Sequence, residues 1–244
     1  MYDFNGRSII VTGGATGIGC GITQMLLEYG ANVLAVGRRD YEIVDEQLKK
    51  HSAFGYLQAD INHPPDRQRI IQTAIENNAR LDVLINNAGA RTSKAFVDLT
   101  DDDIYADMAT NLTSPMILCR EAIPHLKQSK GCIINISSIA ANHVFEKTAA
   151  YGTAKAGLNQ FTCLLAQELG KYDIRVNAIS PGWVETQFTE KYLSEPQNRQ
   201  AALGRMGLNR IGQPMDIANA ACFLASEQAQ WVTGQIFEVS GGFN

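Results

Sequence analysis

Short apolar runs recur along the chain and alternate with longer segments of mixed polarity. The first run, Ser8-Ile9-Ile10-Val11, is β-branched and continuously apolar, as expected for a strand that is buried on both faces of a sheet. The runs cover residues 8–11, 31–36, 54–59, 81–85, 132–136, 174–179 and 235–239. The pattern therefore predicts about seven strands.

The segments between these runs have the length and punctuation of helices. Helices are predicted over residues 21–30, 41–50, 63–79, 148–171 and 214–226, with a further long helix from Thr100. Gly30 is expected to end the first helix, Thr100 to cap the long one, and Pro124 to end or kink it. The regular alternation predicts an α/β fold over residues 1–244, namely a single-domain Rossmann-like doubly wound parallel sheet with helices on both faces.

Composition narrows the function classes. Apolar residues make up 45% of the chain, charged residues 19%, and the net charge is −4, which argues against a generic nucleic-acid binder. No apolar stretch approaches the roughly 18 residues that span a bilayer, and no secretory signal is visible, so no membrane partner is expected. The five cysteines and four histidines are widely scattered. This spacing indicates reduced thiols, a cytoplasmic location and no metal site.

A glycine-rich turn follows the first predicted strand and opens the first helix. Its sequence is Thr12-Gly13-Gly14-Ala15-Thr16-Gly17-Ile18-Gly19. The backbone N–H groups of such a turn can hold a pyrophosphate at a helix N-terminus. Gly13 and Gly17 permit close approach, and Gly19 permits tight packing of helix on strand. The other polar motifs also follow predicted strands, where ligands bind in sheets of this kind.

Two arginines follow the second predicted strand, where a carboxylate would bind the ribose hydroxyls of NAD(H). The guanidinium groups of Arg38 and Arg39 can instead pair with a 2′-phosphate. NADP(H) is therefore the favoured cofactor. Asp40 stands near the usual distance for a ribose-binding acid and keeps NAD(H) as the alternative.

Tyr151 and Lys155 stand four residues apart on a predicted helix and so share one face. A free phenol titrates at about pH 10. A neighbouring ammonium is expected to lower the pKa of Tyr151 and to make it a better acid–base group. A hydroxyl at the end of the fifth predicted strand, from Ser137 or Ser138, can hydrogen-bond a substrate carbonyl. Together these residues predict an oxidoreductase.

The chain resembles the single-domain branch of the short-chain dehydrogenase/reductase family over essentially its whole length. That branch includes 3-oxoacyl-[acyl-carrier-protein] reductases and sugar and alcohol dehydrogenases. The matching positions are Thr12-Gly13-x-x-x-Gly17-x-Gly19, Asp60, Asn86-Asn87-Ala88-Gly89, Asn111, Ser138, Tyr151-x-x-x-Lys155, Pro181-Gly182 and Thr186. The spacing from Ser138 to Tyr151 is the usual one for the family's catalytic pair, which selects Ser138 over Ser137.

The resemblance implies a role for each catalytic residue. Tyr151 would exchange a proton with the carbonyl or alcohol, Lys155 would hold the nicotinamide ribose, and Ser138 would polarise the carbonyl. Asn111 would position a water that carries protons to solvent. The cofactor itself would carry the hydride. The expected cofactor-binding residues are Gly13, Thr16, Gly17, Ile18, Gly19, Arg38, Arg39, Asp60, Ile61, Asn87, Ala88, Gly89, Tyr151, Lys155, Pro181, Gly182, Val184 and Thr186.

Residues 91–96, 139–148 and 183–210 are expected to set substrate identity, but the sequence does not identify the substrate itself. Residues 183–210 lie where a mobile lid would cover the site. The expected substrate contacts are Ser138, Tyr151, His143 and Trp183. No arginine is singled out for a substrate carboxylate. The cations of the expected lid either attract an acidic carrier protein or form a solvated face; they are Lys191, Arg199, Arg205 and Arg210.

These features predict an NADP(H)-dependent oxidoreductase of a carbonyl or secondary alcohol, with an NAD(H)-dependent sugar or polyol dehydrogenase and a 3-oxoacyl thioester reductase as alternatives. A nucleotide-sugar epimerase or dehydratase would usually need a longer chain and a Gly-x-x-Gly-x-x-Gly turn. A non-catalytic cofactor sensor or scaffold would be expected to lack part of the catalytic set. By analogy with the family, the chain is expected to form a homotetramer or homodimer.

Overall fold

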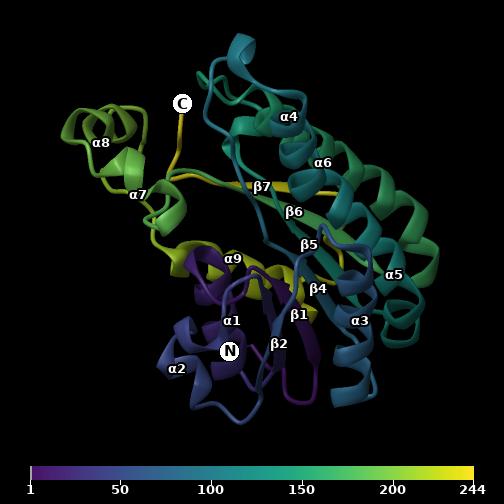
Figure 1. Cartoon of the computed structure of the whole chain (residues 1–244). Coiled ribbons are helices and arrows are strands. Elements are labelled where there is room, and N and C mark those ends of the chain that lie inside the picture. Colours follow the sequence, from purple (N-terminus) through teal and green to yellow (C-terminus); the bar gives the residue numbers. More distant parts are fainter. Residues whose placement is uncertain (1) are drawn as a thin grey trace.

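The computed structural model describes residues 2–244, and over these residues the fold is a seven-stranded parallel sheet between two layers of helices (Figure 1). The order across the sheet is β3-β2-β1-β4-β5-β6-β7, and neighbouring strands pair in parallel throughout. The order reverses between β1 and β4, which is where a sheet of this type forms a ligand-binding crevice. The predicted fold class is confirmed.

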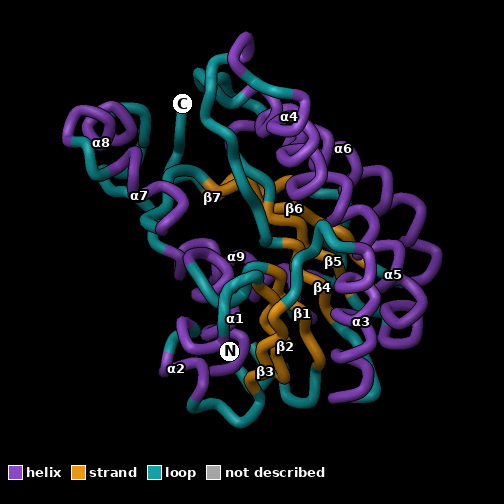
Figure 2. The backbone as a smooth tube through the Cα atoms, viewed as in Figure 1, coloured by secondary structure: helices purple, strands orange, loops and turns teal. Residues whose placement is uncertain are grey.

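The strands lie close to the predicted apolar runs, as Figure 2 shows. They are β1 (Ser8–Thr12), β2 (Asn32–Gly37), β3 (Phe54–Gln58), β4 (Val83–Asn86), β5 (Cys132–Ile136), β6 (Arg175–Pro181) and β7 (Ile236–Val239). Successive side chains of a strand point to opposite faces of the sheet. In β1, Ile9 and Val11 pack into one helix layer and Ile10 into the other. Burial on both faces therefore accounts for the continuous apolar runs.

Helices cover both faces of the sheet (Figure 1). One face carries α1 (Gly17–Glu28), α2 (Glu46–Lys49) and α9 (Pro214–Ala225), and the other carries α3 (Pro64–Asn78), α5 (Ser114–Ser129) and α6 (Ala149–Leu169). The remaining helices are α4 (Asp101–Met108), α7 (Gln187–Leu193) and α8 (Pro196–Leu203). The α7–α8 segment stands away from the sheet (Figure 1). Within residues 2–244, no helix combines the length and the apolar character needed to cross a bilayer.

Two predicted helices differ from the structure. The helix expected over residues 41–50 is a 3₁₀ turn, Tyr41–Ile43, followed by the single turn of α2. Only Leu48 of α2 is buried, so one apolar contact does not sustain a longer helix. Pro124 was expected to end or kink the long helix, but α5 continues past it to Ser129. Its buried face, which includes Leu118 and Leu126, stabilises the helix against the loss of one backbone hydrogen bond.

Two predicted helix ends are confirmed. The Thr100 hydroxyl accepts a hydrogen bond of 3.2 Å from the backbone N–H of Asp103, and the Asp103 carboxylate accepts one of 3.0 Å from the N–H of Thr100. This reciprocal capping box begins α4. Gly30 follows α1 with φ at +88°, the left-handed conformation that glycine adopts without strain.

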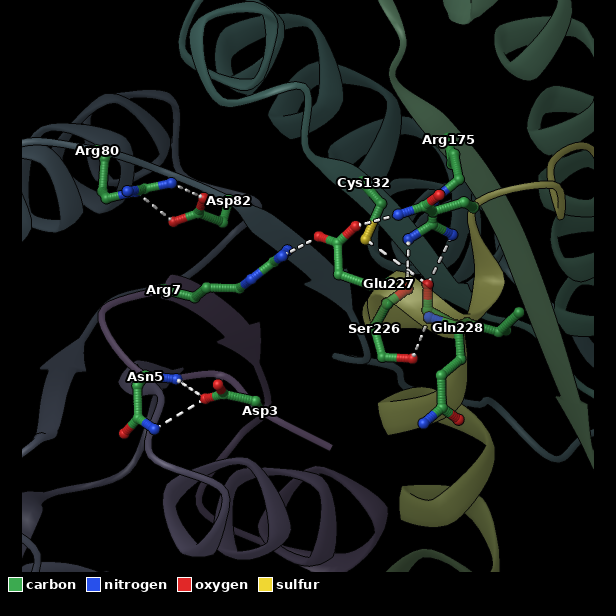
Figure 3. Close-up of polar contacts among 12 residues, drawn as sticks. Asp3, Asn5, Arg7, Arg80, Asp82, Cys132, Arg175, Ser226, Glu227 and Gln228 are labelled. Carbon is green, nitrogen blue, oxygen red and sulfur yellow. Dashed lines mark hydrogen bonds and ion pairs between the residues drawn. The ribbon is translucent and has the colours of Figure 1, made fainter. Parts of the chain in front are cut away.

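The amino ends of the strands are held together by charged groups (Figure 3). Asp82 is buried, accepts a hydrogen bond of 2.8 Å from Ser8 N–H, and pairs with Arg80. Arg7 pairs with Glu227 across the same edge. A buried carboxylate needs such partners because its desolvation is costly. These charges therefore stabilise the edge of the sheet opposite to the one where ligands bind.

Candidate active site

A cavity of about 420 Å³ lies at the carboxyl ends of the strands. It is lined by the turns that follow β1, β2, β3, β4, β5 and β6, and by residues of α6 and α7. The cofactor residues expected from the sequence line it, with one exception: Gly13, Thr16, Gly17, Ile18, Arg38, Arg39, Asp60, Ile61, Asn87, Ala88, Gly89, Tyr151, Lys155, Pro181, Gly182, Val184 and Thr186. The exception is Gly19, which lies behind the glycine turn.

The glycine turn needs its glycines for close approach. Gly13 and Gly17 have φ of +64° and +53°, in the left-handed region. A Cβ on Gly13 would lie 2.9 Å from Nδ2 of Asn87, and a Cβ on Gly19 would clash with the carbonyl oxygen of Gly13. Asn87 in turn donates a hydrogen bond of 2.9 Å to the Thr12 carbonyl oxygen. The turns after β1 and β4 are thus joined across the switch point.

Tyr151 and Lys155 both project from α6 into the cavity, and both are buried, with exposed fractions of 7% and 3%. The Lys155 ammonium lies 5.9 Å from the centre of the Tyr151 ring. It donates a hydrogen bond of 2.8 Å to the carbonyl oxygen of Ile136. The four-residue spacing therefore places both groups in one cavity, as the sequence predicts.

Two serines follow β5, and their hydroxyls have different partners. The Ser138 side chain acts on the Tyr151 hydroxyl, where it opposes the rise that burial causes in the pKa, and accepts a hydrogen bond of 3.1 Å from Ala140 N–H. The Ser137 hydroxyl instead donates to the backbone carbonyl of Lys155 at 3.3 Å. Of the two, Ser138 is therefore the hydroxyl that lies beside the phenol.

Burial controls the ionisation of both groups on α6. It raises the pKa of Tyr151, although Ser138 and the positive charge of Arg91 act in the opposite direction. Burial also lowers the pKa of Lys155 to about 8. The expected lowering of the Tyr151 pKa by Lys155 is thus not seen: desolvation of the phenol is the largest effect, and the groups that act on it are Ser138, Arg91 and Asp107. The phenol is held as a proton donor at neutral pH.

Asn111 lies in a π-helical turn, Ala109–Thr113, between α4 and α5. Its side chain is fully buried and donates hydrogen bonds to the carbonyl oxygens of Ala90 at 2.7 Å and Asp107 at 2.8 Å. A Cβ on Gly89 would lie 3.2 Å from its Oδ1. Turns of this wider kind occur frequently at functional sites. Asn111 therefore supports the loop after β4 from behind the cavity wall.

The two other expected substrate contacts lie in different places. Trp183 lines the cavity and stacks on Tyr192, with ring centres 4.6 Å apart. His143 lies outside the lining, where its Nε2 is 3.5 Å from a Glu238 carboxylate oxygen and its ring packs edge-on against Phe243. The structure therefore brings Trp183, but not His143, to the cavity surface.

Sequence reasoning missed Arg91 and Phe188 as individual residues of the cavity. The guanidinium carbon of Arg91 lies 5.3 Å from the centre of the Phe188 ring. That ring lies 6.1 Å from the ring of Tyr151. The signal available for Arg91 was its position directly after the Asn86–Gly89 turn, at the carboxyl end of a strand. Phe188 lines the cavity only because α7, which carries it, folds back over the cavity.

The cations of the 183–210 segment are largely engaged within the protein. Arg199 pairs with Glu185, and Arg210 pairs with Asp216 at 2.6 Å. The guanidinium of Arg205 lies 4.2 Å from the centre of the Phe243 ring. Such contacts leave less free positive charge on this surface than the sequence alone suggests.

Comparison with known proteins defines the class of protein. The family model described as "Enoyl-(Acyl carrier protein) reductase" matches residues 13–244. On this match and on relatives more than 30% identical over nearly the whole chain, the chain belongs to the short-chain dehydrogenase/reductase family. It is an NAD(P)-dependent oxidoreductase that acts on CH–OH or C=O groups.

Individual relatives cover nearly the whole chain. The 3-oxoacyl-[acyl-carrier-protein] reductase FabG of Chlamydia pneumoniae is 34% identical over 241 residues, which cover 97% of this chain and 96% of the relative. Cyclopentanol dehydrogenase of a Comamonas species is 32% identical over 247 residues, covering 100% and 99%. The solved RhlG/NADP active-site complex of Pseudomonas aeruginosa has a TM-score of 0.92 and 33% identity, covering 99% of this chain and 97% of its own.

Proposed function

We propose that the protein is an NADP(H)-dependent reductase or dehydrogenase of a small carbonyl compound or secondary alcohol, with Tyr151 as the acid–base group. One observation carries the proposal. Tyr151 and Lys155 from α6, with Ser138 after β5, line the same cavity as the glycine turn after β1. A proton donor therefore lies beside a dinucleotide-type turn.

The residues present fit a nicotinamide dinucleotide. The close approach at Gly13 and Gly17 leaves backbone N–H groups free of side chains, as a pyrophosphate requires. We assign Asp60 and Ile61 to the adenine end, Lys155 to the nicotinamide ribose, and Thr186 to the nicotinamide amide. When bound, the nicotinamide would supply or accept the hydride.

The surroundings of β2 support NADP(H) over NAD(H). Arg38 and Arg39 both line the cavity, whereas Asp40 does not. The Asp40 carboxylate accepts a hydrogen bond of 2.9 Å from the Gln58 amide instead. Of the groups that follow β2, the cavity therefore presents guanidinium groups, which pair well with a phosphate. The similar RhlG protein of Pseudomonas aeruginosa was solved as a complex with NADP.

The proposed chemistry follows from the three groups around the phenol. In reduction, the Tyr151 hydroxyl would give its proton to the carbonyl oxygen as the carbonyl carbon is reduced, leaving a phenolate. The Ser138 hydroxyl donates a hydrogen bond to the same oxygen as its negative charge grows. Lys155 would hold the nicotinamide ribose beside the phenol, and a water positioned by Asn111 would return a proton from solvent to the phenolate. Oxidation of an alcohol runs the same transfers in reverse.

The 183–210 segment supports a small substrate rather than one on a carrier protein. We propose that this segment, which holds α7 and α8, closes the cavity as a lid. Since Arg199 and Arg210 already pair with acids, few free cations remain to attract an acidic carrier. The 3-oxoacyl thioester reductase stays the alternative, because a relative carries that name.

The assembly and location are also proposals. Leu164 of α6, Tyr105 of α4 and Met116 of α5 expose apolar side chains. These support assembly as a homotetramer, or a homodimer, through the long helices, and a sedimentation experiment that finds a stable monomer would exclude it. All five cysteines are free thiols in the structure, which supports a cytoplasmic location.

The experiment that tests the proposal is a substrate screen that follows nicotinamide absorbance with NADPH and NADH, and with their oxidised forms and alcohols. The proposal predicts turnover of small carbonyl compounds and faster turnover with NADPH than with NADH. Tight cofactor binding with no turnover across the panel would favour a cofactor sensor or scaffold instead.

A further inference from the structure

We propose that Arg91 binds a carboxylate of the substrate, so that the substrates of this enzyme are hydroxy acids and the corresponding oxo acids. The inference rests on the oxidoreductase function proposed above and names its substrate class. It assigns a specificity-determining role to a residue that the sequence did not single out.

Arg91 is placed on the substrate side of the cavity. It follows the turn after β4, whereas Arg38 and Arg39 follow β2 on the other side of β1. Its guanidinium carbon lies 5.3 Å from the centre of the Phe188 ring, which is 6.1 Å from the centre of the Tyr151 ring. The positive charge of Arg91 also reaches the phenol, since it lowers the pKa of Tyr151 against the effect of burial. A group bound to Arg91 would therefore lie close to the proton donor.

The charge of Arg91 is available to a ligand. Among the side chains of residues 2–244, its guanidinium has no ion-pair partner and makes no hydrogen bond, although it is partly buried. The cation nearest in sequence, Lys94, pairs with Asp103 at 2.7 Å. Burial raises the pKa of the Asp107 carboxyl and the charge of Arg91 acts against that rise, but Asp107 accepts a hydrogen bond of 3.0 Å from Thr92 N–H and is not paired with Arg91 directly. A partly desolvated cation that lacks a direct ion pair is further stabilised by an anion that enters the cavity.

A carboxylate suits this position better than other anions. A guanidinium binds the two oxygens of a carboxylate through parallel hydrogen bonds. A single cation matches the single negative charge of a carboxylate, while a phosphate dianion would be only half neutralised. The neighbouring rings of Phe145, Trp183 and Phe188 offer an apolar wall to the rest of the molecule. The geometry thus describes an acid with an apolar body whose reacting carbon lies near its carboxylate.

The test compares each acid with its methyl ester, because the ester removes the charge and keeps the carbon skeleton. Phenyllactate and 3-hydroxybutyrate serve as probes with their methyl esters, at saturating oxidised cofactor. The readout is the ratio of kcat/KM for the acid to kcat/KM for the ester. Arg91→Met is expected to lower this ratio roughly 10–100-fold, mainly through KM, as expected for loss of a charged hydrogen-bonded pair. Arg91→Lys should lower the ratio less than Arg91→Met does, since it keeps the positive charge but loses the two parallel N–H donors of the guanidinium.

Lys94→Met is the matched control, because it removes a cation of the same loop that already has a partner. Its ratio should equal that of the wild type. An unchanged ratio in Arg91→Met, or a wild-type enzyme that prefers esters, overturns the inference.

A binding measurement separates this inference from the proposed function. Phenylpyruvate and its methyl ester are titrated calorimetrically into the wild type and Arg91→Met, each saturated with oxidised cofactor. Acid binding that weakens at least tenfold in Arg91→Met supports the carboxylate site, whether or not a substrate turns over. Absence of turnover would count against the oxidoreductase proposal and not against the role of Arg91. Equal acid binding by both proteins, or no acid binding by the wild type, contradicts the role of Arg91.

Discussion

The ammonium of Lys155 donates a hydrogen bond of 2.8 Å to the carbonyl oxygen of Ile136, the last residue of β5. The bond fixes a side chain of α6 at the carboxyl end of the sheet, beside the Tyr151 ring. The position is almost fully buried, and the pKa of Lys155 is therefore lowered to about 8. A buried charge without an acidic partner costs folding stability, so its presence at this point indicates function rather than structure.

The stability of the protein is expected to depend on pH through Lys155. Its ordinary pKa of 10.5 falls to about 8 on folding, so between these pH values the unfolded chain binds more protons than the folded one. Stability contributed by this group therefore rises with pH across that window. Relative to Lys155→Met, which does not titrate, the wild type should gain about 3 kcal/mol in free energy of unfolding from pH 8 to pH 10.5.

Urea unfolding of both proteins at several pH values in this range measures the effect. The comparison with Lys155→Met removes the contributions of other titrating groups, which both proteins share. A difference between the two proteins that does not change with pH would show that the lysine keeps its ordinary pKa in the folded state.

Cofactor preference is expected to depend on Arg39. Its guanidinium lines the cavity and donates a hydrogen bond of 2.7 Å to the side chain of Gln187 at the start of α7. Arg39→Ala should raise the dissociation constant for NADPH roughly 10–100-fold, the usual effect of losing a charged hydrogen bond. The constant for NADH, which has no 2′-phosphate, should change by less than about twofold.

Fluorescence titration of both cofactors measures these constants. Lys50→Ala is the control, since this exposed cation lies outside the cavity lining. An equal loss of affinity for NADPH and NADH would show that Arg39 does not distinguish the two cofactors, and it would favour NAD(H) again as the alternative.

Gly21 is expected to be required for the packing of α1 on α9. A Cβ at this position would lie 2.9 Å from Cβ of Pro214 and 3.1 Å from its carbonyl carbon. Alanine gains about 1 kcal/mol of helix propensity over glycine, whereas overpacking against backbone costs about 1–3 kcal/mol. Gly21→Ala should therefore lower the free energy of unfolding, by about 1 kcal/mol.

Gly170→Ala is the matched comparison. Nothing lies within 4 Å of a Cβ there, and the backbone has helical angles, with φ of −55° and ψ of −35°. This variant should be more stable than the wild type by about 0.4–1 kcal/mol. Denaturant unfolding measures the change in free energy of unfolding for both variants. An increase in Gly21→Ala would contradict the prediction and would mean that α1 and α9 can move apart at little cost.

Much of the fold was predictable because its signals are local. The apolar run at residues 132–136 became β5 at the same bounds, since burial on both faces favours apolar residues there; the one polar residue, Asn135, is buried and hydrogen-bonded to Asn86 and Thr162. Gly13, Gly17 and Gly30 adopt the positive φ values for which glycine is suited. Thr100 caps α4 because its partner, Asp103, lies three residues away. Each of these outcomes depends on residues that are close in sequence.

The rest depends on residues that are distant in sequence. Arg91 and Phe188 meet only because α7 returns over the loop after β4, and no periodicity reports that contact. In the π-helical turn, the Asn111 side chain bonds the carbonyl oxygen of Ala90, which is 21 residues away in the sequence. The pKa of Tyr151 is raised because tertiary packing excludes water from the phenol, an effect that spacing to Lys155 does not reveal. The sequence predicted most of the residues that line the cavity, but only the structure shows how deeply the phenol and the ammonium are buried.

The most direct test of the proton-transfer role is a comparison of the wild type with Tyr151→Phe on a turned-over carbonyl substrate. Phenylalanine keeps the ring that packs against Phe188 and removes only the hydroxyl. The account predicts that kcat falls roughly 10²–10⁴-fold while the dissociation constant for NADPH changes by less than about twofold. Turnover by Tyr151→Phe at the wild-type rate would contradict it.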